Sequence, residues 1–165
     1  METIPETGQK QSVVHNTFVL ERSFSQPPQS VFAAFADPAK KRRWFADETQ
    51  HEVEKFEAEF RVGGFERVSY RMKPGTPIAG KTISSMGCYL DIVENRRIVS
   101  ASTMALDEKP ISAALVTIEL LPSGGGTNLI CTHQGAFFQG ADGPAMREAG
   151  WRALIEKLAR ALESE

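Results

Sequence analysis

Cysteine and histidine are scarce in this chain. Of its 165 residues, two are cysteines, Cys88 and Cys131, which lie far apart without a Cys-x-x-Cys spacing. This pattern predicts reduced thiols rather than a disulfide framework or a zinc site. The three histidines, His15, His51 and His133, also lack the close spacing that favours a metal site. We therefore expect neither a metal nor any other cofactor.

Long apolar runs and targeting signals are also missing. No stretch approaches the roughly 20 apolar residues that a membrane-spanning helix needs. Residues 1–6 lack the basic and apolar regions of a signal peptide, so we expect a cytoplasmic protein without a membrane partner. The length fits one domain, because single domains run to roughly 50 to 250 residues. The polar composition of residues 1–15 predicts a flexible N-terminal arm, followed by a single domain over residues 16–165.

A large excess of charge of either sign is absent as well. The formal net charge is −2 at pH 7, which gives no electrostatic reason to expect a nucleic acid or an acidic membrane as a partner. One basic run, Lys40-Lys41-Arg42-Arg43, precedes Trp44, and cations beside an aromatic ring can contact phosphates while the ring stacks. No second basic cluster accompanies this run, and such runs are usually solvated helix faces. We therefore expect no nucleic-acid partner.

Motifs of well-known catalytic sites are absent. The chain has no Gly-x-Ser-x-Gly elbow, Walker loop, dinucleotide-binding glycine fingerprint or His-Glu-x-x-His sequence. The run Gly124-Gly125-Gly126 lies between predicted strands rather than before a helix. His133 is the best single candidate for catalysis, because a neutral imidazole can transfer a proton near neutral pH. The alternative for the same residue is a hydrogen-bonded polar side chain among apolar neighbours.

A long amphipathic helix is predicted from about Gly143 to Leu162. Its apolar residues recur at spacings of three and four and share one stripe: Trp151, Leu154, Ile155, Leu158 and Leu162. Asp142 offers a capping side chain before it, and Glu156 with Arg160 has the orientation that favours an i,i+4 ion pair. Gly150 costs about 1 kcal/mol relative to alanine inside a helix. Either the backbone approaches another element there, or a guest fits beside the helix, or the glycine is merely tolerated.

The chain before this helix reads mostly as strands joined by turn residues. Apolar and polar residues alternate from Thr17 to Phe24, and Pro27-Pro28 ends this first strand. Two short helices are predicted next, from Pro28 through Phe35 and from Asp37-Pro38 towards Phe45. Further strands are predicted over residues 53–57, 65–72, 83–93, 97–106, 114–120 and 127–138, with Asp107–Pro110 among the connecting loops. This order indicates an α+β fold.

Strand alternation assigns side chains to the faces of the sheet. The last strand places four side chains on one face: Leu129, Cys131, His133 and Phe137. Charges on two other strands are interpreted as exposed: Glu66, Arg67, Asp91 and Glu94. Three aromatic residues, Trp44, Phe45 and Trp151, either line a pocket or fill the core, because aromatic rings supply large buried areas in any core.

Several phrases occur in a characteristic order. They are Glu21-Arg22-Ser23-Phe24, Pro27-Pro28, Val31-Phe32, Trp44-Phe45, Val62-Gly63-Gly64-Phe65, residues 87–94, residues 126–129, residues 132–138, Arg147-Glu148 and Gly150-Trp151. In this order the chain resembles the START-like helix-grip superfamily, also called SRPBCC, over about residues 17 to 162. Within it, the chain is most similar to the branch of the activator of heat-shock-protein-90 ATPase homologues.

The resemblance implies the helix-grip (START/Bet v-like) fold. In that fold a curved antiparallel sheet of about six or seven strands wraps around the long C-terminal helix, and two short helices follow the first strand. Residues 16–165 would then form one helix-grip ligand-binding domain, with a largely apolar cavity between sheet and helix. The expected ligand-binding residues are Phe35, Trp44, Phe45, Phe65, Tyr89, Leu129, Cys131, His133, Phe137, Trp151, Leu154, Ile155 and Leu158.

Three functions are compatible with this fold. The first is binding of a hydrophobic or aromatic small molecule, with affinity mainly from burial of its apolar surface. The second is a cyclase- or hydrolase-type enzyme in which His133 and a nearby carboxylate such as Glu21 act as acid and base. The third, implied only by the branch, is a chaperone partner that activates its ATPase. We favour binding, because catalysis needs a constellation that the sequence does not show. Long exposed strands and the habits of the superfamily also favour a homodimer.

Overall fold

The computed structural model describes residues 12–46 and 51–165 of the chain. Most of the predicted N-terminal arm lies outside the described residues. The element order is the predicted one: a strand, two short helices, a series of strands and a long helix. The elements are β1 (Val13–Phe24), α1 (Pro28–Ala36), α2 (Pro38–Phe45), β2 (His51–Ala58), β3 (Phe65–Met72), β4 (Thr82–Val93), β5 (Arg97–Leu106), β6 (Lys109–Ser123), β7 (Gly126–Phe138) and α3 (Pro144–Glu163).

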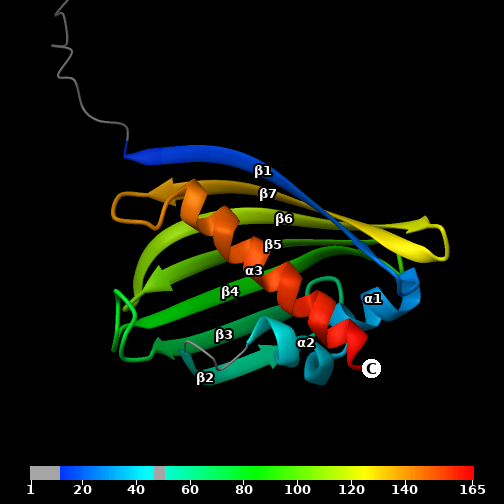
Figure 1. Ribbon diagram of the computed structural model, residues 1–165. Coiled ribbons are helices and arrows are strands. Elements are labelled where there is room, and N and C mark those ends of the chain that lie inside the picture. Colours follow the sequence, from blue (N-terminus) through cyan, green and yellow to red (C-terminus); the bar gives the residue numbers. More distant parts are fainter. Residues whose placement is uncertain (1–11, 47–50) are drawn as a thin grey trace, which may run out of the picture.

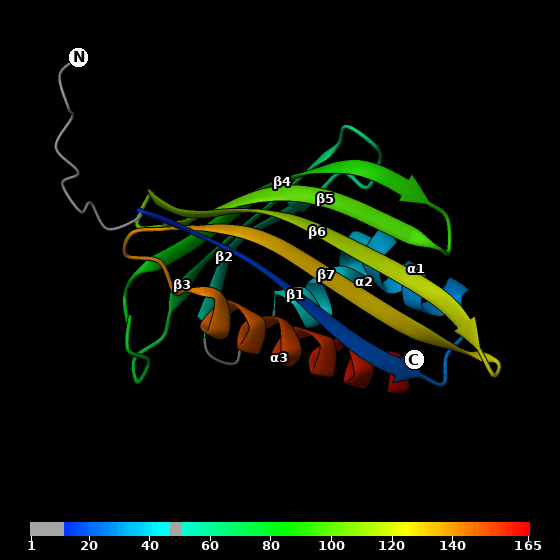
Figure 2. The same ribbon diagram turned by 90° about the horizontal axis from the view of Figure 1, so that it is seen from above.

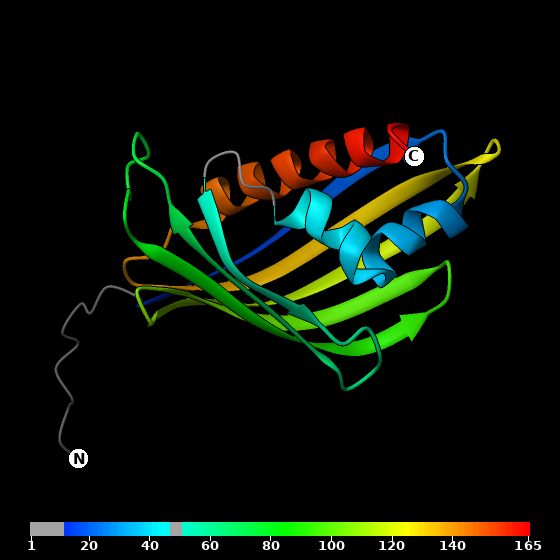
Figure 3. The same ribbon diagram turned by 90° about the horizontal axis from the view of Figure 1, so that it is seen from below.

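The strands form one seven-stranded antiparallel sheet in the order β1-β7-β6-β5-β4-β3-β2. From β2 to β7 each strand pairs with the next along the chain, whereas β1 pairs with β7. Helix α3 crosses the strands diagonally (Figure 1), and the sheet curves around it (Figures 2 and 3). Helices α1 and α2 lie on the same face, beside the C-terminal part of α3 (Figure 3). The predicted helix-grip fold is confirmed, and we call the face that carries α3 the inner face.

Two strands begin four or more residues earlier than predicted. β1 begins at Val13, so residues 13–15 of the predicted arm belong to a strand. β6 begins at Lys109, because Asp107 and Glu108 adopt positive φ angles of 46° and 66° and turn the chain within two residues. The sequence analysis predicted a loop over Asp107–Pro110, and the structure shortens it to this two-residue turn.

The inner face and one stripe of α3 form the hydrophobic core. In β7, alternate side chains from Leu129 to Phe137 are buried, as the alternation predicted. Helix α3 contributes its predicted stripe, but only its last three members are buried: Ile155, Leu158 and Leu162. The first two members, Trp151 and Leu154, are half-buried. The C-terminal half of α3 therefore closes the core, and the N-terminal half covers a different region.

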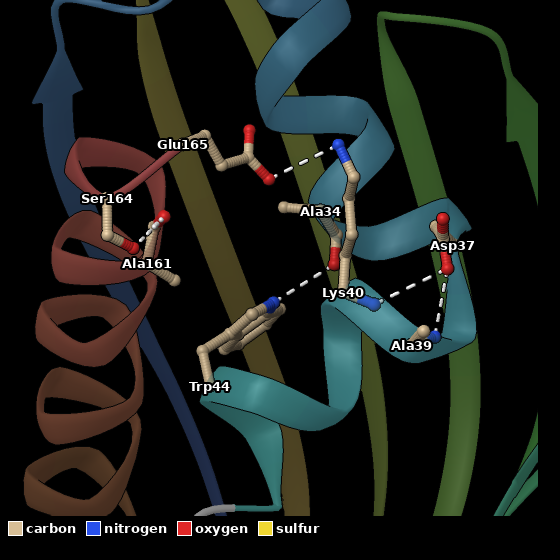
Figure 4. Close-up of polar contacts among 8 residues, drawn as sticks. All are labelled: Ala34, Asp37, Ala39, Lys40, Trp44, Ala161, Ser164 and Glu165. Carbon is tan, nitrogen blue, oxygen red and sulfur yellow. Dashed lines mark hydrogen bonds and ion pairs between the residues drawn. The ribbon is translucent and has the colours of Figure 1, made fainter.

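Polar contacts fasten the two short helices and the end of α3 together (Figure 4). Asp37 ends α1 and caps α2, because its carboxylate accepts two backbone N–H groups of the first turn at 2.9 and 3.4 Å. Trp44 is 1% exposed, and its indole N–H donates to the Ala34 carbonyl at 3.0 Å. Lys40 Nζ lies 3.2 Å from Oε1 of Glu165, just beyond α3. These contacts set the angle between α1 and α2 and hold both against α3.

Helix α3 departs from the sequence prediction on its solvent side. Glu156 pairs with Arg22 of β1 instead of the predicted i,i+4 partner. A Cβ added at Gly150 would meet nothing within 4 Å, so close backbone approach does not explain this glycine. Among the described residues, no helix combines the length and apolar character needed to cross a membrane.

Candidate functional site

Most of the predicted ligand-binding residues lie in the closed core. They are 6% exposed or less and pack in one cluster: Phe35, Trp44, Tyr89, Leu129, Cys131, Ile155 and Leu158. Phe45 packs against this cluster and is half-buried. Burial raises the pKa of the Cys131 thiol to about 12, so this cysteine stays protonated. A ligand would contact these side chains only by displacing core packing.

Three other predicted residues meet under the N-terminal half of α3. The ring of His133 lies 6.2 Å from that of Phe137 and 6.3 Å from that of Trp151, measured between centroids. Phe18 of β1 stacks on the His133 ring, with centroids 4.6 Å apart and planes 2° apart. Leu154 follows Trp151 along the same stripe of α3 and is also half-buried. The structure thus gathers an aromatic group around one histidine.

Small side chains line the inner face beside this aromatic group. The strand register places Gly135 of β7, Ala114 of β6, Ser102 of β5 and Gly87 of β4 opposite one another. A Cβ added at Gly135 would lie 2.9 Å from the His133 ring and 2.8 Å from the Phe137 ring, so this glycine lets both rings lie over the strand. We call these four residues the small-residue row. It leaves more room between sheet and helix than branched side chains would.

A buried arginine reaches the same region from the first turns of α3. Arg147 is 8% exposed, and its Nε and Nη2 donate to both carboxylate oxygens of Asp142 at 2.8 Å. Nη2 also donates to the Ser112 hydroxyl of β6 at 2.9 Å, and the guanidinium lies 5.1 Å from the centre of the Phe137 ring. Asp142 does not cap α3 as predicted, because the N-cap is Gly143 and makes no side-chain cap. The arginine charge is thus paired and hydrogen-bonded, as a buried charge requires.

His133 and Tyr70 are two titratable polar groups of this region. His133 is 1% exposed, and its Nδ1 has no hydrogen-bond partner within the described residues. Burial is the main reason why its pKa falls from 6.5 to about 4, and the charge of Arg147 acts in the same direction. Burial also raises the pKa of the Tyr70 hydroxyl. The charge of Arg147 lowers this pKa and that of Asp142 raises it, each by less than burial does. Both side chains are therefore neutral at pH 7.

Acid should destabilise the protein through His133. Because its pKa is about 4 in the fold against an ordinary 6.5, the unfolded chain binds this proton more strongly, and stability falls as the pH drops through that interval. We expect a loss on the order of 3 kcal/mol near pH 4 relative to neutral pH. Urea unfolding at both pH values measures it, with His133→Gln as the comparison. If the wild type and His133→Gln lose equal stability between neutral pH and pH 4, His133 is not the source of the acid sensitivity.

The predicted acid–base pair of His133 and Glu21 is not formed. His133 lies opposite Phe18 in the strand register and is buried on the inner face, whereas Glu21 is exposed on the other face of β1. The carboxylate that acts electrostatically on His133 is that of Asp142, which Arg147 already holds. Glu21 therefore cannot act with His133 as the acid–base pair that the enzyme hypothesis requires.

A second buried polar cluster joins α2 to the sheet. Lys41 Nζ lies 2.5 Å from Oε2 of Glu66 and 4.5 Å from the centre of the Phe45 ring. The Tyr89 hydroxyl donates to the same Oε2 at 2.5 Å. Lys41 is 7% exposed and the Glu66 side chain 15%. The predictions of a solvated helix face and an exposed strand charge are therefore wrong for these two residues. Burial, reinforced by Glu66, raises the pKa of Tyr89 far above its usual value.

A hollow of about 770 Å³ lies on the outer face of the sheet, opposite α3. Its walls include Phe65, Met86 and Leu115, whose side chains point away from the inner face. Phe65, which was expected to line the inner cavity, faces outward here, with the Arg67 guanidinium 4.5 Å from its ring centre. The outer face of the sheet is therefore concave beside Phe65, Met86 and Leu115.

Comparisons with known proteins match nearly the whole chain. The family model described as Activator of Hsp90 ATPase homolog 1-like protein matches residues 25–163. No curated protein was found to match. The crystal structure of the Mll3558 protein from Rhizobium loti is 43% identical with a TM-score of 0.81, covering 92% of this chain and 99% of that one. A structure from Rhizobium leguminosarum is 34% identical with a TM-score of 0.86, covering 93% and 98%. The CV1439 protein from Chromobacterium violaceum is 27% identical with a TM-score of 0.74, covering 90% and 97%.

Proposed function

We propose a function from the premise that this chain belongs to the family of Activator of Hsp90 ATPase homolog 1-like proteins. The function is reversible binding of a hydrophobic or aromatic small molecule between the inner face of the sheet and the N-terminal half of α3. The observation that carries it is the small-residue row beside the rings of His133, Phe137 and Trp151. Small-molecule sites combine apolar and aromatic walls with a few polar groups, which is the composition of this region.

The expected affinity is modest and guides the choice of a test ligand. A two-ring aromatic molecule buries roughly 150–250 Å², as an aromatic side chain does. At about 25 cal/mol per Å² this burial contributes roughly 4–6 kcal/mol before the costs of ordering the ligand. Binding of such a fragment is therefore expected at high micromolar to millimolar concentrations, which nuclear magnetic resonance (NMR) titrations detect. A larger natural ligand that fills the region would bind more tightly.

Two neighbouring alanines on β6 provide a matched test. Both alanines line the outer hollow, but they alternate along β6: the side chain of Ala113 faces the hollow, whereas that of Ala114 is in phase with Ser112 and faces the inner side of the sheet. We expect 2-naphthol to shift the indole N–H signal of Trp151, and Ala114→Leu to weaken its binding by at least about tenfold by filling the space. Ala113→Leu should leave the affinity unchanged. The opposite result, with Ala113→Leu alone blocking the ligand, would move the site to the outer hollow and overturn the proposal.

Native mass spectrometry of the purified protein, followed by denaturing extraction, identifies any natural ligand. A co-purified apolar compound supports the proposal and names its chemical class. The same spectrum reports whether the protein is a homodimer. If 2-naphthol does not bind and a chaperone co-purifies instead, the ATPase-activating role in the family's description would replace small-molecule binding as the better proposal.

A further inference from the structure

We propose that the polar group of the ligand is uncharged, a hydroxyl or a carbonyl rather than a carboxylate, and that it lies at His133 beside Arg147. This inference rests on the binding function proposed above and specifies the class of molecule. It is carried by three features of the site: how Arg147 is already occupied, how the charges of the region balance, and which buried polar atom lacks a partner.

The edge of Arg147 that would normally take a carboxylate is already filled. Carboxylates bind arginine most strongly through two parallel hydrogen bonds to one edge of the guanidinium. Here Asp142 forms both of these bonds, to Nε and Nη2, at 2.8 Å each. The remaining Nη2 hydrogen bond goes to Ser112 at 2.9 Å. A ligand carboxylate could form such a pair of hydrogen bonds only by displacing Asp142 or Ser112, and it would otherwise meet Nη1 alone.

The charges around the site cancel before any ligand arrives. Arg147 and Asp142 contribute opposite charges, while His133 and Tyr70 are neutral at pH 7 because burial shifts the pKa of each away from its charged form. An anionic ligand would bring an uncompensated charge out of water and place it near Asp142, which is strongly unfavourable without a paired cation. Desolvation of a hydroxyl or a carbonyl is much less unfavourable, and one hydrogen bond in the site offsets it.

His133 supplies the unsatisfied group that such a ligand would meet. Its Nδ1 is buried without a hydrogen-bond partner among the described residues, and the side chain is 1% exposed. A buried polar atom without a hydrogen bond is destabilising, so a ligand that supplies the partner gains affinity. A neutral imidazole offers one donor and one acceptor, so it can bind a hydroxyl or a carbonyl equally well. The rings of Phe18 and Trp151 flank it, which suits an aromatic alcohol or ketone.

A pair of probes with the same rings tests the charge preference. At pH 7, 2-naphthol is neutral and 2-naphthoate is ionised, and the Trp151 indole signal reports binding of either one at the inner site. We expect the wild type to bind the naphthol at least about tenfold more tightly. Asp142→Asn leaves the charge of Arg147 uncompensated. The ratio of naphthol affinity to naphthoate affinity should therefore fall about tenfold relative to the wild type. Asp91→Asn is the matched control, because it changes an exposed Asp–Arg pair, to Arg97 at 2.6 Å.

The possible outcomes test the charge preference and the binding function separately. Tighter binding of the naphthoate by the wild type overturns the uncharged-head-group inference while the binding function stands. A Trp151 signal that responds to neither probe overturns both. An equal change of preference in Asp142→Asn and Asp91→Asn shows a general charge effect and also overturns the inference. If Asp142→Asn does not fold, as circular dichroism would show, the wild-type preference alone decides.

Discussion

Replacing Glu66 with leucine should lower the free energy of unfolding by about 3–5 kcal/mol, because it leaves the charge of Lys41 buried without its partner. In the native structure Lys41 Nζ lies 2.5 Å from Glu66, and the two side chains are 9% and 15% exposed. The Tyr89 hydroxyl donates to the same carboxylate and would also lose its acceptor. Denaturant unfolding at neutral pH measures the loss.

Two controls separate the buried pair from charge changes in general. The double variant Lys41→Met/Glu66→Leu should recover most of the lost stability, because apolar residues of similar volume can replace a buried ion pair. Glu57→Leu, which removes an exposed ion pair to Lys55 at 3.6 Å, should cost no more than about 1 kcal/mol. If Glu66→Leu and Glu57→Leu cost the same, the buried pair does not hold α2 on the sheet as we describe.

Trp44→Ala should also cost about 3–5 kcal/mol, because it removes the largest fully buried side chain of the fold. The indole packs edge-on against Phe35 and Phe45, with centroids 5.0 and 5.6 Å apart. Its N–H donates to the Ala34 carbonyl at 3.0 Å, so the substitution also removes a buried hydrogen bond (Figure 4). Thermal or urea unfolding of the variant measures the combined effect.

The ring and the hydrogen bond of Trp44 can be told apart with further variants. Trp44→Phe keeps most of the packing and leaves the Ala34 carbonyl without its donor, which should cost about 1–3 kcal/mol. Trp151→Ala removes the half-buried tryptophan and should cost clearly less than Trp44→Ala. A loss for Trp151→Ala as large as that for Trp44→Ala would show that the region under the N-terminal half of α3 is as closed as the core.

Periodicity in the sequence predicted the fold well where one face of an element is uniformly apolar. The alternation from Leu129 to Phe137 and the stripe from Trp151 to Leu162 both assign the inner face correctly. The same periodicity also indicates two inward-facing positions that are occupied by charged residues. Glu66 alternates in phase with Val68, and Arg147 lies about one helical turn before Trp151, so both positions face inward. The charge of Glu66 favoured an exposed interpretation, and Arg147 was assigned to neither side, so only the partners found in the fold explain why both face inward.

The candidate site was harder to predict because its polar partners come from separate elements. Asp142, Arg147 and Ser112 belong to a loop, α3 and β6, and Ser112 lies 35 residues from Arg147 in the sequence. No local pattern reports that such groups meet. Phe65 shows the reverse case, because it alternates in phase with Arg67 on the outer face, while the family resemblance placed it in the cavity. Local alternation was the better guide at that position.

The pairing of β1 with β7 has a consequence for the order in which the chain folds during synthesis. The Thr127 hydroxyl donates to the carbonyl of Gln26, 101 residues earlier, and marks the end of this pairing. At roughly 5–20 residues per second, the ribosome needs on the order of 5–20 s to supply the partner of the first strand. The consecutive hairpins from β2 to β6 can form in that time, because each strand already has its neighbour. β1 therefore joins the sheet only after β7 has been made, and the proposed ligand-binding region forms only after β7 and α3 have left the ribosome.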